Sequence, residues 1–249
     1  MPIRLTRSVT VLSLIILMSF IFQKTLDLYF GAQLGFFLSL RSSSFFDQHF
    51  FWQVVTYPFV SSDVSQLFFN LLMFVFVGAD LEQIWGSRSF LKFFFFCTLS
   101  VGLIYVLSGW GGETPLSGIS GALYGLFAAY GILLGERTLL FMMIVPVQAK
   151  YFAMTLAGIQ LLTALFTPGA WVTALAHLTG MVMGFLYLWI QMRWRLSIRS
   201  QQGYFLGNQL KKFTKKRARS GKHLKLVVNR LDDLEQEDEG SKDSPKTWH

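Results

Sequence analysis

Six long apolar stretches constrain the fold of this chain more than any other feature of its sequence. They lie at residues 9–30, 64–83, 90–108, 118–135, 149–166 and 171–191. Each is close to the roughly 20 mostly apolar residues that one helical crossing of a bilayer needs. Polar residues interrupt the first stretch, but no small-residue cleavage site follows it, so we interpret it as a span and not as a signal peptide. The pattern predicts an all-α membrane protein with six transmembrane helices.

Two further segments are too apolar for ordinary loops. Leu139–Val147 is too short to cross a bilayer and contains Pro146, which indicates an interfacial or re-entrant element. The long segment 31–63 is rich in aromatic side chains, which are favoured at the level of the lipid headgroups. These side chains are Phe45, Phe46, Phe50, Phe51 and Trp52. We therefore expect segment 31–63 to lie in the membrane interface.

The charged residues are concentrated after the last apolar stretch. Residues 1–192 hold 8 Lys and Arg and 7 Asp and Glu, whereas residues 193–249 hold 14 and 7. The net charge of +8 therefore comes almost wholly from the tail, and it does not indicate a nucleic-acid partner. We expect a six-span membrane domain over 1–192. The tail over 193–249 is expected to be cytosolic and partly disordered, or to rest on anionic lipid.

The basic residues between the spans predict how the chain is oriented in the bilayer. With six spans, one face of the bundle carries Arg4, Arg7, Arg88, Lys92, Arg137, Lys150 and the basic tail. The loops of the opposite face hold Arg41 as their one clear basic residue. Because loops rich in Lys and Arg stay on the cytoplasmic side, both termini are predicted to be cytoplasmic.

Two hydroxyls and several glycines stand where the fourth span should begin, in the stretch LSGISGALYG. A helix start exposes unpaired N–H groups, so the backbone amide of Ser120 could donate to an oxyanion. The alternative is that Ser117 or Ser120 simply caps the helix. Gly121, Gly125 and Ala129 recur every four residues. Such a stripe of small residues lets another helix approach closely.

The sixth span carries the one histidine that falls within a span, His177, in the stretch ALAHLTGMVMG. Ala176, Gly180 and Gly184 form a second small-residue stripe, and His177 shares a helical face with the two glycines. The residues alone leave open whether His177 is functional or a buried structural histidine bonded to a carbonyl. If the two stripes pack together, Ser120 and His177 can come within hydrogen-bond reach, as a nucleophile and its general base.

Three more polar residues could support that pair. Tyr124 lies one turn after Ser120 and could pack against the imidazole, or it could be ordinary packing. Gln66 and Asn70 project from one face of the second span, four residues apart. Their amides could donate to a developing oxyanion. The alternative is an interhelical hydrogen bond that holds the bundle together.

Taken together, these motifs resemble the rhomboid family of intramembrane serine proteases. GISG (Gly118–Gly121), followed by Tyr124, is similar to the family's Gly-x-Ser-Gly nucleophile motif. AHLTGMVMG (Ala176–Gly184) is similar to its Ala-His-x-x-Gly-x-x-x-Gly motif. FWQVVTYPF leading to QLFFN resembles the family's first loop and second span, and GADLEQIWGSR resembles the stretch that closes that span. The resemblance covers about residues 45–191.

The resemblance implies a six-helix bundle with a membrane-embedded first loop. Ser120 would attack the scissile carbonyl, and His177 would act as base and then as acid. Asn70, Gln66 and the Ser120 amide would form the oxyanion hole, and Gly118, Gly121, Gly180, Gly184 and Tyr124 would support the site. The expected substrates are transmembrane segments of membrane proteins, cut near the outer face without metal or cofactor. The fifth span is commonly proposed to gate lateral entry, and a prokaryotic cell membrane is the expected location.

Two positions depart from the family pattern and keep a second function open. The first loop has Gln53 where the family usually has Arg, which removes a charged structural anchor. Gln66 stands where the family usually has His, so we expect weaker oxyanion stabilisation. The alternative is a non-catalytic rhomboid-like protein that binds or escorts other membrane proteins. A transporter ranks last, because the spans hold too few paired ionisable residues for an ion path.

Overall fold

The computed structural model describes residues 6–31, 33–109, 114–141 and 145–193. The chain divides into two compact units, Met1–Ile190 and Gln191–His249. Of the second unit only residues 191–193 are described, and they end a helix. The predicted tail therefore lies almost wholly outside the described residues, and its separation from the membrane domain stays a prediction.

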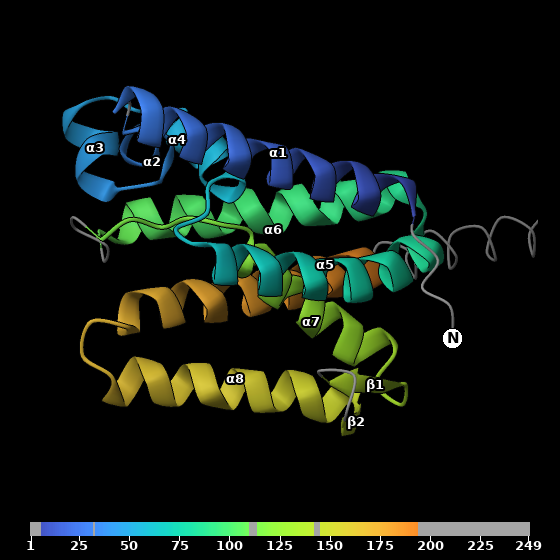
Figure 1. Cartoon of the computed structure of the whole chain (residues 1–249). Coiled ribbons are helices and arrows are strands. Elements are labelled where there is room, and N and C mark those ends of the chain that lie inside the picture. Colours follow the sequence, from blue (N-terminus) through green and yellow to red (C-terminus); the bar gives the residue numbers. More distant parts are fainter. Residues whose placement is uncertain (1–5, 32, 110–113, 142–144, 194–249) are drawn as a thin grey trace, which may run out of the picture. The chain divides into compact units, whose positions relative to one another are not determined.

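Long helices build the first unit, as the apolar stretches predict (Figure 1). They are α1 (Arg7–Phe30), α5 (Val64–Trp85), α6 (Ser87–Ser108), α7 (Ser120–Leu133), α8 (Ala149–Phe166) and Trp171–Arg193, which we call the His177 helix. Within the described residues, five of these are long and apolar enough to cross a membrane. The prediction of an all-α membrane bundle is confirmed.

The fourth predicted span, 118–135, is shorter than expected. Its helix, α7, has only 14 residues and begins at Ser120, two positions after a glycine with a positive φ. A 14-residue helix rises about 21 Å, which is less than the thickness of a hydrocarbon core of about 30 Å. The count of six crossing helices therefore stays a prediction, while five helices have the length to cross.

The short apolar run at Leu139–Val147 is a β-hairpin that joins α7 to α8. Strand β1 (Thr138–Phe141) pairs antiparallel with β2 (Val145–Gln148), and Leu140 lies opposite Pro146. In a two-stranded ribbon both strands are edges, so a proline that cannot donate to the ladder is tolerated. The length of the run predicted an interfacial or re-entrant element, but it did not reveal the strand pairing.

The segment between α1 and α5 folds into short helices that pack on α1 and α6. These are α2 (Leu34–Leu38), α3 (Ser42–Asp47), α4 (Gln53–Thr56) and the 3₁₀ turn η1 (Tyr57–Phe59). Leu40, Val54 and Tyr57 form one buried cluster with residues of α6. The Tyr57 hydroxyl also donates to the Thr98 carbonyl at 2.7 Å. This long connection is therefore a built part of the fold.

The neutral side chain of Gln53 anchors this first loop. It is completely buried. Its Oε1 accepts from the Arg41 backbone N–H at 3.2 Å, and its Nε2 donates to the Phe36 and Phe37 carbonyls at 3.3 Å each. The sequence predicted that Gln in place of Arg removes a charged anchor. The structure shows that a neutral amide bonds the backbone of the loop at this position.

A buried carboxylate ties the start of α1 to α5 and α6. Glu82 is 3% exposed, and it accepts from the backbone N–H groups of Ser8 and Val9 at 2.9 Å each. The Thr6 and Ser87 hydroxyls donate to the same carboxylate. A buried charge needs this full set of donors, and the unpaired N–H groups of a helix start provide two of them. Glu82 therefore holds three helix ends together.

Candidate active site

The first loop positions the chain segment that leads into α7. Leu40 and Leu116 pair through two backbone hydrogen bonds, of 2.9 and 2.8 Å. The Gly118 N–H then donates to the Tyr57 carbonyl at 2.9 Å. Gly118 has a φ of +85°, a backbone conformation that residues with a Cβ rarely adopt. The turn at Gly118 therefore places Ser120 at the first position of α7.

Neither serine in this stretch caps the helix. The residue before the first turn of α7 is Ile119, and no side chain makes a cap hydrogen bond there. The hydroxyl of Ser117 lies 3.0 Å from that of Ser62. Ser120 is only 9% exposed. The capping alternative therefore fails, and the Ser120 N–H sits among the unpaired donors that begin an α-helix.

The two glycine stripes pack against each other, as the sequence predicts. A Cβ added to Gly180 would lie 2.0 Å from the Gly121 carbonyl oxygen, and one added to Gly184 would lie 2.7 Å from that of Gly125. Both contacts are to backbone, which cannot move aside as a side chain can. The His177 helix and α7 thus approach closely along one seam, and only glycine allows that approach.

His177 stacks on Tyr124 across this seam. The two rings are 4.3 Å apart between centroids and inclined by 12°. Within the described residues, neither ring nitrogen of His177 has a hydrogen-bond partner, although both are buried. The structural alternative, a histidine bonded to a carbonyl, is therefore not what the structure shows. A buried polar group left without a partner requires an explanation, and a catalytic role is one.

The predicted hydrogen bond between Ser120 and His177 is not made in this structure, since both imidazole nitrogens lack a partner. The glycine seam brings the two helices together, but the side chains stop short of a hydrogen bond. Catalytic hydrogen bonds are often long before substrate binds and tighten in the complex.

Two amide side chains of α5 meet at the turn before Ser120. The Asn70 Nδ2 and the Gln66 Nε2 each lie 3.4 Å from the position that a Cβ on Gly118 would take. Asn70 Nδ2 is buried and has no partner within the described residues. Gln66 Oε1 accepts from the Ser62 N–H at 3.0 Å. That bond uses the oxygen, so the Gln66 nitrogen is the end that faces Gly118.

The start of α5 is capped, which sets where Gln66 lies. Asp63 accepts from the Gln66 N–H at 2.8 Å and from the Ser65 hydroxyl at 2.6 Å. The hydrogen bond from the Ser65 side chain, followed by that from the Gln66 backbone, lowers the pKa of Asp63 below its usual range. The ionised carboxylate accepts these hydrogen bonds and keeps the first turn of α5 in place.

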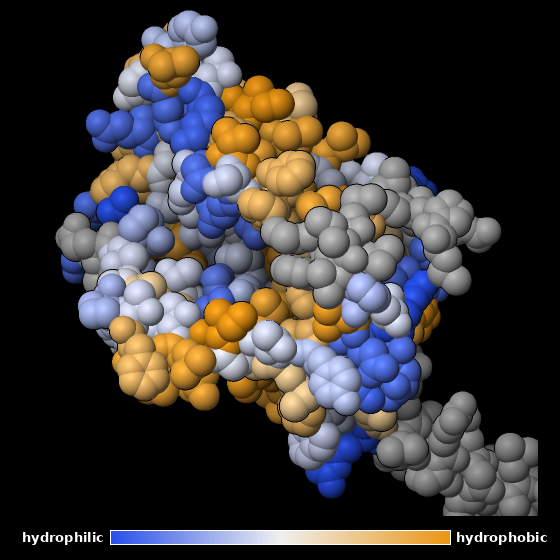
Figure 2. All heavy atoms as spheres, turned by 60° about the horizontal axis from the view of Figure 1, so that its bottom comes forward, coloured by the Kyte–Doolittle hydropathy of each residue, from blue (hydrophilic) through white to orange (hydrophobic). Residues whose placement is uncertain are grey.

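One polar residue near the site is not among those singled out from the sequence. The Gln160 Nε2 of α8 donates to the Tyr124 hydroxyl. The available signal was an amide in the middle of an otherwise apolar span, where an unpaired polar group is costly. Figure 2 shows the molecule with the side of α8 turned forward; the face has a hollow near its middle, bordered largely by pale and blue residues, with apolar residues farther out. Over the described residues, no group of three or more His, Cys, Asp or Glu could hold a metal ion.

These features define a class of protein. It is a polytopic helical membrane protein in which a serine begins a helix that packs through a glycine seam against the helix carrying a histidine, with two amide side chains near the turn before the serine. A family model described as the Rhomboid domain matches residues 48–194, which is more than half of the chain. The chain belongs to the rhomboid family.

Two curated plant proteins are similar to this chain. One is "RHOMBOID-like protein 1" of Arabidopsis thaliana, 30% identical over 169 residues, covering 64% of this chain and 38% of that protein. The other is "Rhomboid-like protein 19" of the same plant, 26% identical over 152 residues, covering 56% and 48%. The chain thus matches less than half the length of either relative, and the names of these relatives state a family likeness and no reaction.

Proposed function

We propose that this protein is an intramembrane serine endopeptidase that cleaves transmembrane segments of membrane proteins near the outer face. The observation that carries the proposal is that His177 stacks on Tyr124 of the helix that Ser120 begins, while its two buried ring nitrogens have no hydrogen-bond partner within the described residues. A buried imidazole beside a serine at a helix start is suited to nucleophilic catalysis. Family membership supports the proposal but does not by itself establish an activity.

Each residue has a defined step in the proposed reaction. The Ser120 hydroxyl attacks the scissile carbonyl while His177 takes its proton. His177 then gives that proton to the leaving amine, and water hydrolyses the acyl-enzyme by the same sequence. The Asn70 and Gln66 amides and the Ser120 N–H donate to the oxyanion. Losing one such donor costs about 10²–10³ in rate. The buried Asn70 Nδ2 has no partner within the described residues, so it is available for this role.

The test uses a small covalent probe together with a membrane substrate. Detergent-solubilised protein is treated with a fluorophosphonate, and a transmembrane reporter is cleaved in lipid. We expect the wild type to be labelled and to cleave, and Ser120→Ala to do neither. Ser117→Ala is the matched control, because it removes a nearby hydroxyl whose hydrogen bond, within the described residues, is to Ser62. Labelling that persists in Ser120→Ala would remove Ser120 as the nucleophile.

A non-catalytic rhomboid-like binder remains the second candidate, because the Ser120–His177 hydrogen bond is not made and Gln66 replaces the usual histidine. The two candidates differ in what His177→Ala does. The protease requires that this variant lose cleavage, whereas a binder would still capture membrane proteins in a crosslinking experiment. An unlabelled wild type that captures them as well as His177→Ala would favour the binder.

The orientation in the membrane is also a proposal. We propose that both termini face the cytoplasm, as the distribution of Lys and Arg predicts. The prokaryotic cell membrane expected from the resemblance stays a prediction, and the two plant relatives lend it no support. Because the single cysteine, Cys97, is buried, new cysteines can report the sidedness. An impermeant maleimide should label Asp47→Cys in intact cells and Glu136→Cys only after permeabilisation; the reverse pattern would invert the orientation.

A further inference from the structure

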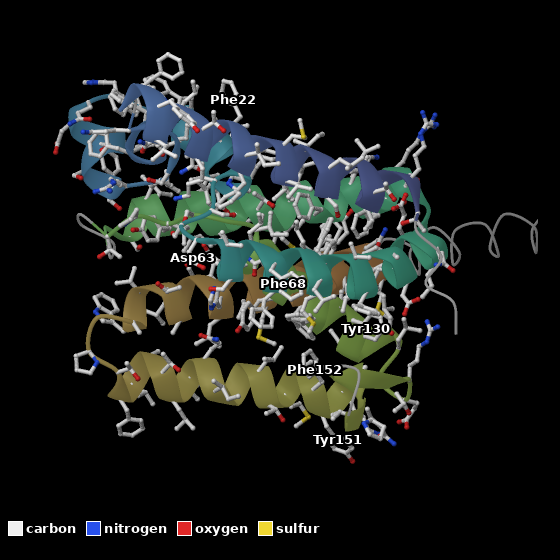
Figure 3. All side chains as sticks on the ribbon, in the orientation of Figure 1. Phe22, Asp63, Phe68, Tyr130, Tyr151 and Phe152 are labelled. Carbon is white, nitrogen blue, oxygen red and sulfur yellow. The ribbon has the colours of Figure 1, made fainter. Side chains whose placement is uncertain are left out.

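Helix α8 lies along the edge of the bundle (Figure 1). It packs against α7 mainly near its N-terminal end. Its two buried residues are Ala149 and Ala153. A Cβ on Gly131 of α7 would lie 2.8 Å from the Ala153 methyl group, so the helices are in close contact there. The Phe152 ring packs edge-on against Phe127 at 5.3 Å, and Figure 3 shows Phe152 pointing toward α7 while Tyr151 points away.

Farther along, α8 makes one polar contact with α7. Gln160 is half-buried, and its amide donates to the Tyr124 hydroxyl. The last turns of the helix expose their apolar side chains: Leu161, Leu162, Leu165 and Phe166. An amide in an apolar span is costly to leave unpaired, so this hydrogen bond favours a docked α8.

The same hydroxyl belongs to the ring that supports His177. Tyr124 lies parallel to the imidazole at 4.3 Å and edge-on to Phe127 at 5.8 Å. A tyrosine ring can tilt about its two side-chain torsions, and a hydrogen bond at the far end of the ring limits that tilt. Because the ring nitrogens of His177 have no partner within the described residues, the Tyr124 stack is a main contact that orients the imidazole.

We propose that Gln160 is a positioning residue of the active site. By holding the Tyr124 hydroxyl, it keeps the Tyr124 ring, and with it the His177 imidazole, in the orientation needed to receive the proton of Ser120. This inference rests on the proposed protease function. It has a structural consequence: the catalytic pair is fully ordered only while α8 is docked on α7, so one helix of the lipid-facing edge contributes to the chemistry.

The test compares variants that remove either end of the hydrogen bond. Gln160→Met keeps the length of the side chain and removes the donor, and Tyr124→Phe keeps the ring and removes the hydroxyl. Each is expected to lower kcat for a transmembrane substrate by about tenfold with KM changed by less than about threefold, because a small misplacement of a catalytic group slows the chemical step. The double variant should be no slower than either single one.

A second readout separates positioning from movement of α8. A fluorophosphonate is small and brings no helix with it, so its labelling rate depends on the catalytic pair itself. We expect Gln160→Met to slow labelling by about the same factor as cleavage and to alter the pH dependence of labelling. Thr163→Val is the matched control, since in the described part of the chain the Thr163 hydroxyl donates to the Ile159 carbonyl of its own helix. This control should behave as the wild type.

The outcomes of these experiments distinguish a failure of this inference from a failure of the proposed function. Labelling of Gln160→Met within twofold of the wild type would overturn the inference and leave the protease intact. Additive effects in the double variant, or faster cleavage with unchanged labelling, would also overturn it, since Gln160 would then act by another route. A wild type that is not labelled at all would overturn the proposed function and this inference with it. If Gln160→Met fails to fold, as judged by its melting in detergent, Tyr124→Phe tests the same bond from the other side.

Discussion

Helices α7 and α8 follow one another in the chain and are both strongly apolar, yet they are buried very differently. In α7, nine of 14 residues are buried, whereas in α8 only two of 18 are. Apolar residues do not separate a core helix from a peripheral one in a membrane, because lipid satisfies them as well as protein does. What differs is how many of their contacts are made at glycines that let the backbone of a neighbouring helix approach closely. Glycines let α7 pack closely against its neighbours, whereas α8 makes a close contact with a glycine only near its N-terminal end.

The candidate functional groups are also distributed unequally between the closely packed helices and α8. Ser120 and Tyr124 belong to α7, and His177 belongs to the helix pressed against it. Helix α8 contributes one side chain, Gln160, through a single hydrogen bond. The catalytic groups thus sit where packing is closest, and the edge helix is held by contacts that can be weakened one at a time.

The largest expected effect comes from adding a methyl group to the close contact between α7 and the His177 helix. Gly180→Ala would place a methyl group 2.0 Å from the Gly121 carbonyl oxygen, so the helices must separate. We expect a loss of at least about 3 kcal/mol in the free energy of unfolding, together with loss of fluorophosphonate labelling. Thermal unfolding in detergent and the labelling assay measure both.

The matched control for this change is on the other helix. Nothing lies within 4 Å of a Cβ added to Gly158 of α8, so Gly158→Ala meets open space. Because alanine favours helix over glycine, we expect stability to be kept or raised by up to about 1 kcal/mol. If the two substitutions had equal effects, the contrast between α7 and α8 would be wrong.

The next largest loss of stability is expected at the N-terminal end of α8. Gly131→Ala would bring a methyl group 2.8 Å from that of Ala153, so α8 must shift outward. Overpacking of this kind costs about 1–3 kcal/mol. The swap Gly131→Ala with Ala153→Gly restores the volume and should recover most of the loss in thermal unfolding. A single variant as stable as the wild type would show that α8 is not fastened there.

A smaller effect is expected at the ion pair below α7. Asp80 of α5 accepts from the Tyr130 hydroxyl at 2.8 Å and lies 3.0 Å from Arg137, before the hairpin. Both side chains of the ion pair are partly exposed, so Asp80→Asn should cost about 1 kcal/mol or less. The difference from wild type should shrink at high salt, because salt screens exposed charges. A loss that is independent of salt would assign the effect to the Tyr130 hydrogen bond.

The smallest effect is expected at the exposed pair beside the hairpin. Lys150 and Glu136 lie 2.6 Å apart, but Glu136 is 81% exposed. We expect Glu136→Gln to leave the melting temperature unchanged within error, since exposed ion pairs gain little in water. A clear drop in melting temperature would mean that the link between α7 and α8 is stiffer than its exposure suggests.

The sequence predicted much of the site because its signals are local. A four-residue repeat of small residues indicates the face of a helix that packs closely against another helix. Ser120, Tyr124 and His177 lie next to such repeats in the sequence. Asn70 and Gln66 are four apart on α5, which puts them on one face before any fold is known. Their meeting at Gly118 depends on the first loop, whose backbone pairing with Leu116 carries no clear pattern in the sequence.

Other features could not be predicted in this way. The consequence of Gln53 depends on three backbone partners in a loop that is itself irregular. The hairpin at 138–148 is a short apolar run, and short apolar runs do not distinguish a strand from a buried helix. Gln160 was a lone amide in a span, and its importance depends on which side chain of another helix it meets.

The sequence by itself determined that the chain forms a helical membrane bundle, which two helices carry small-residue stripes, and which serine and histidine lie beside them. Hydrophobic length and helical periodicity act within one segment, so they can be read without a fold. Tertiary structure alone decided that α7 is short and deeply packed, that α8 lies at the edge, and that the Ser120–His177 bond is not made. These outcomes depend on contacts between segments far apart in the chain, where a shift of about 1 Å separates a hydrogen bond from its absence.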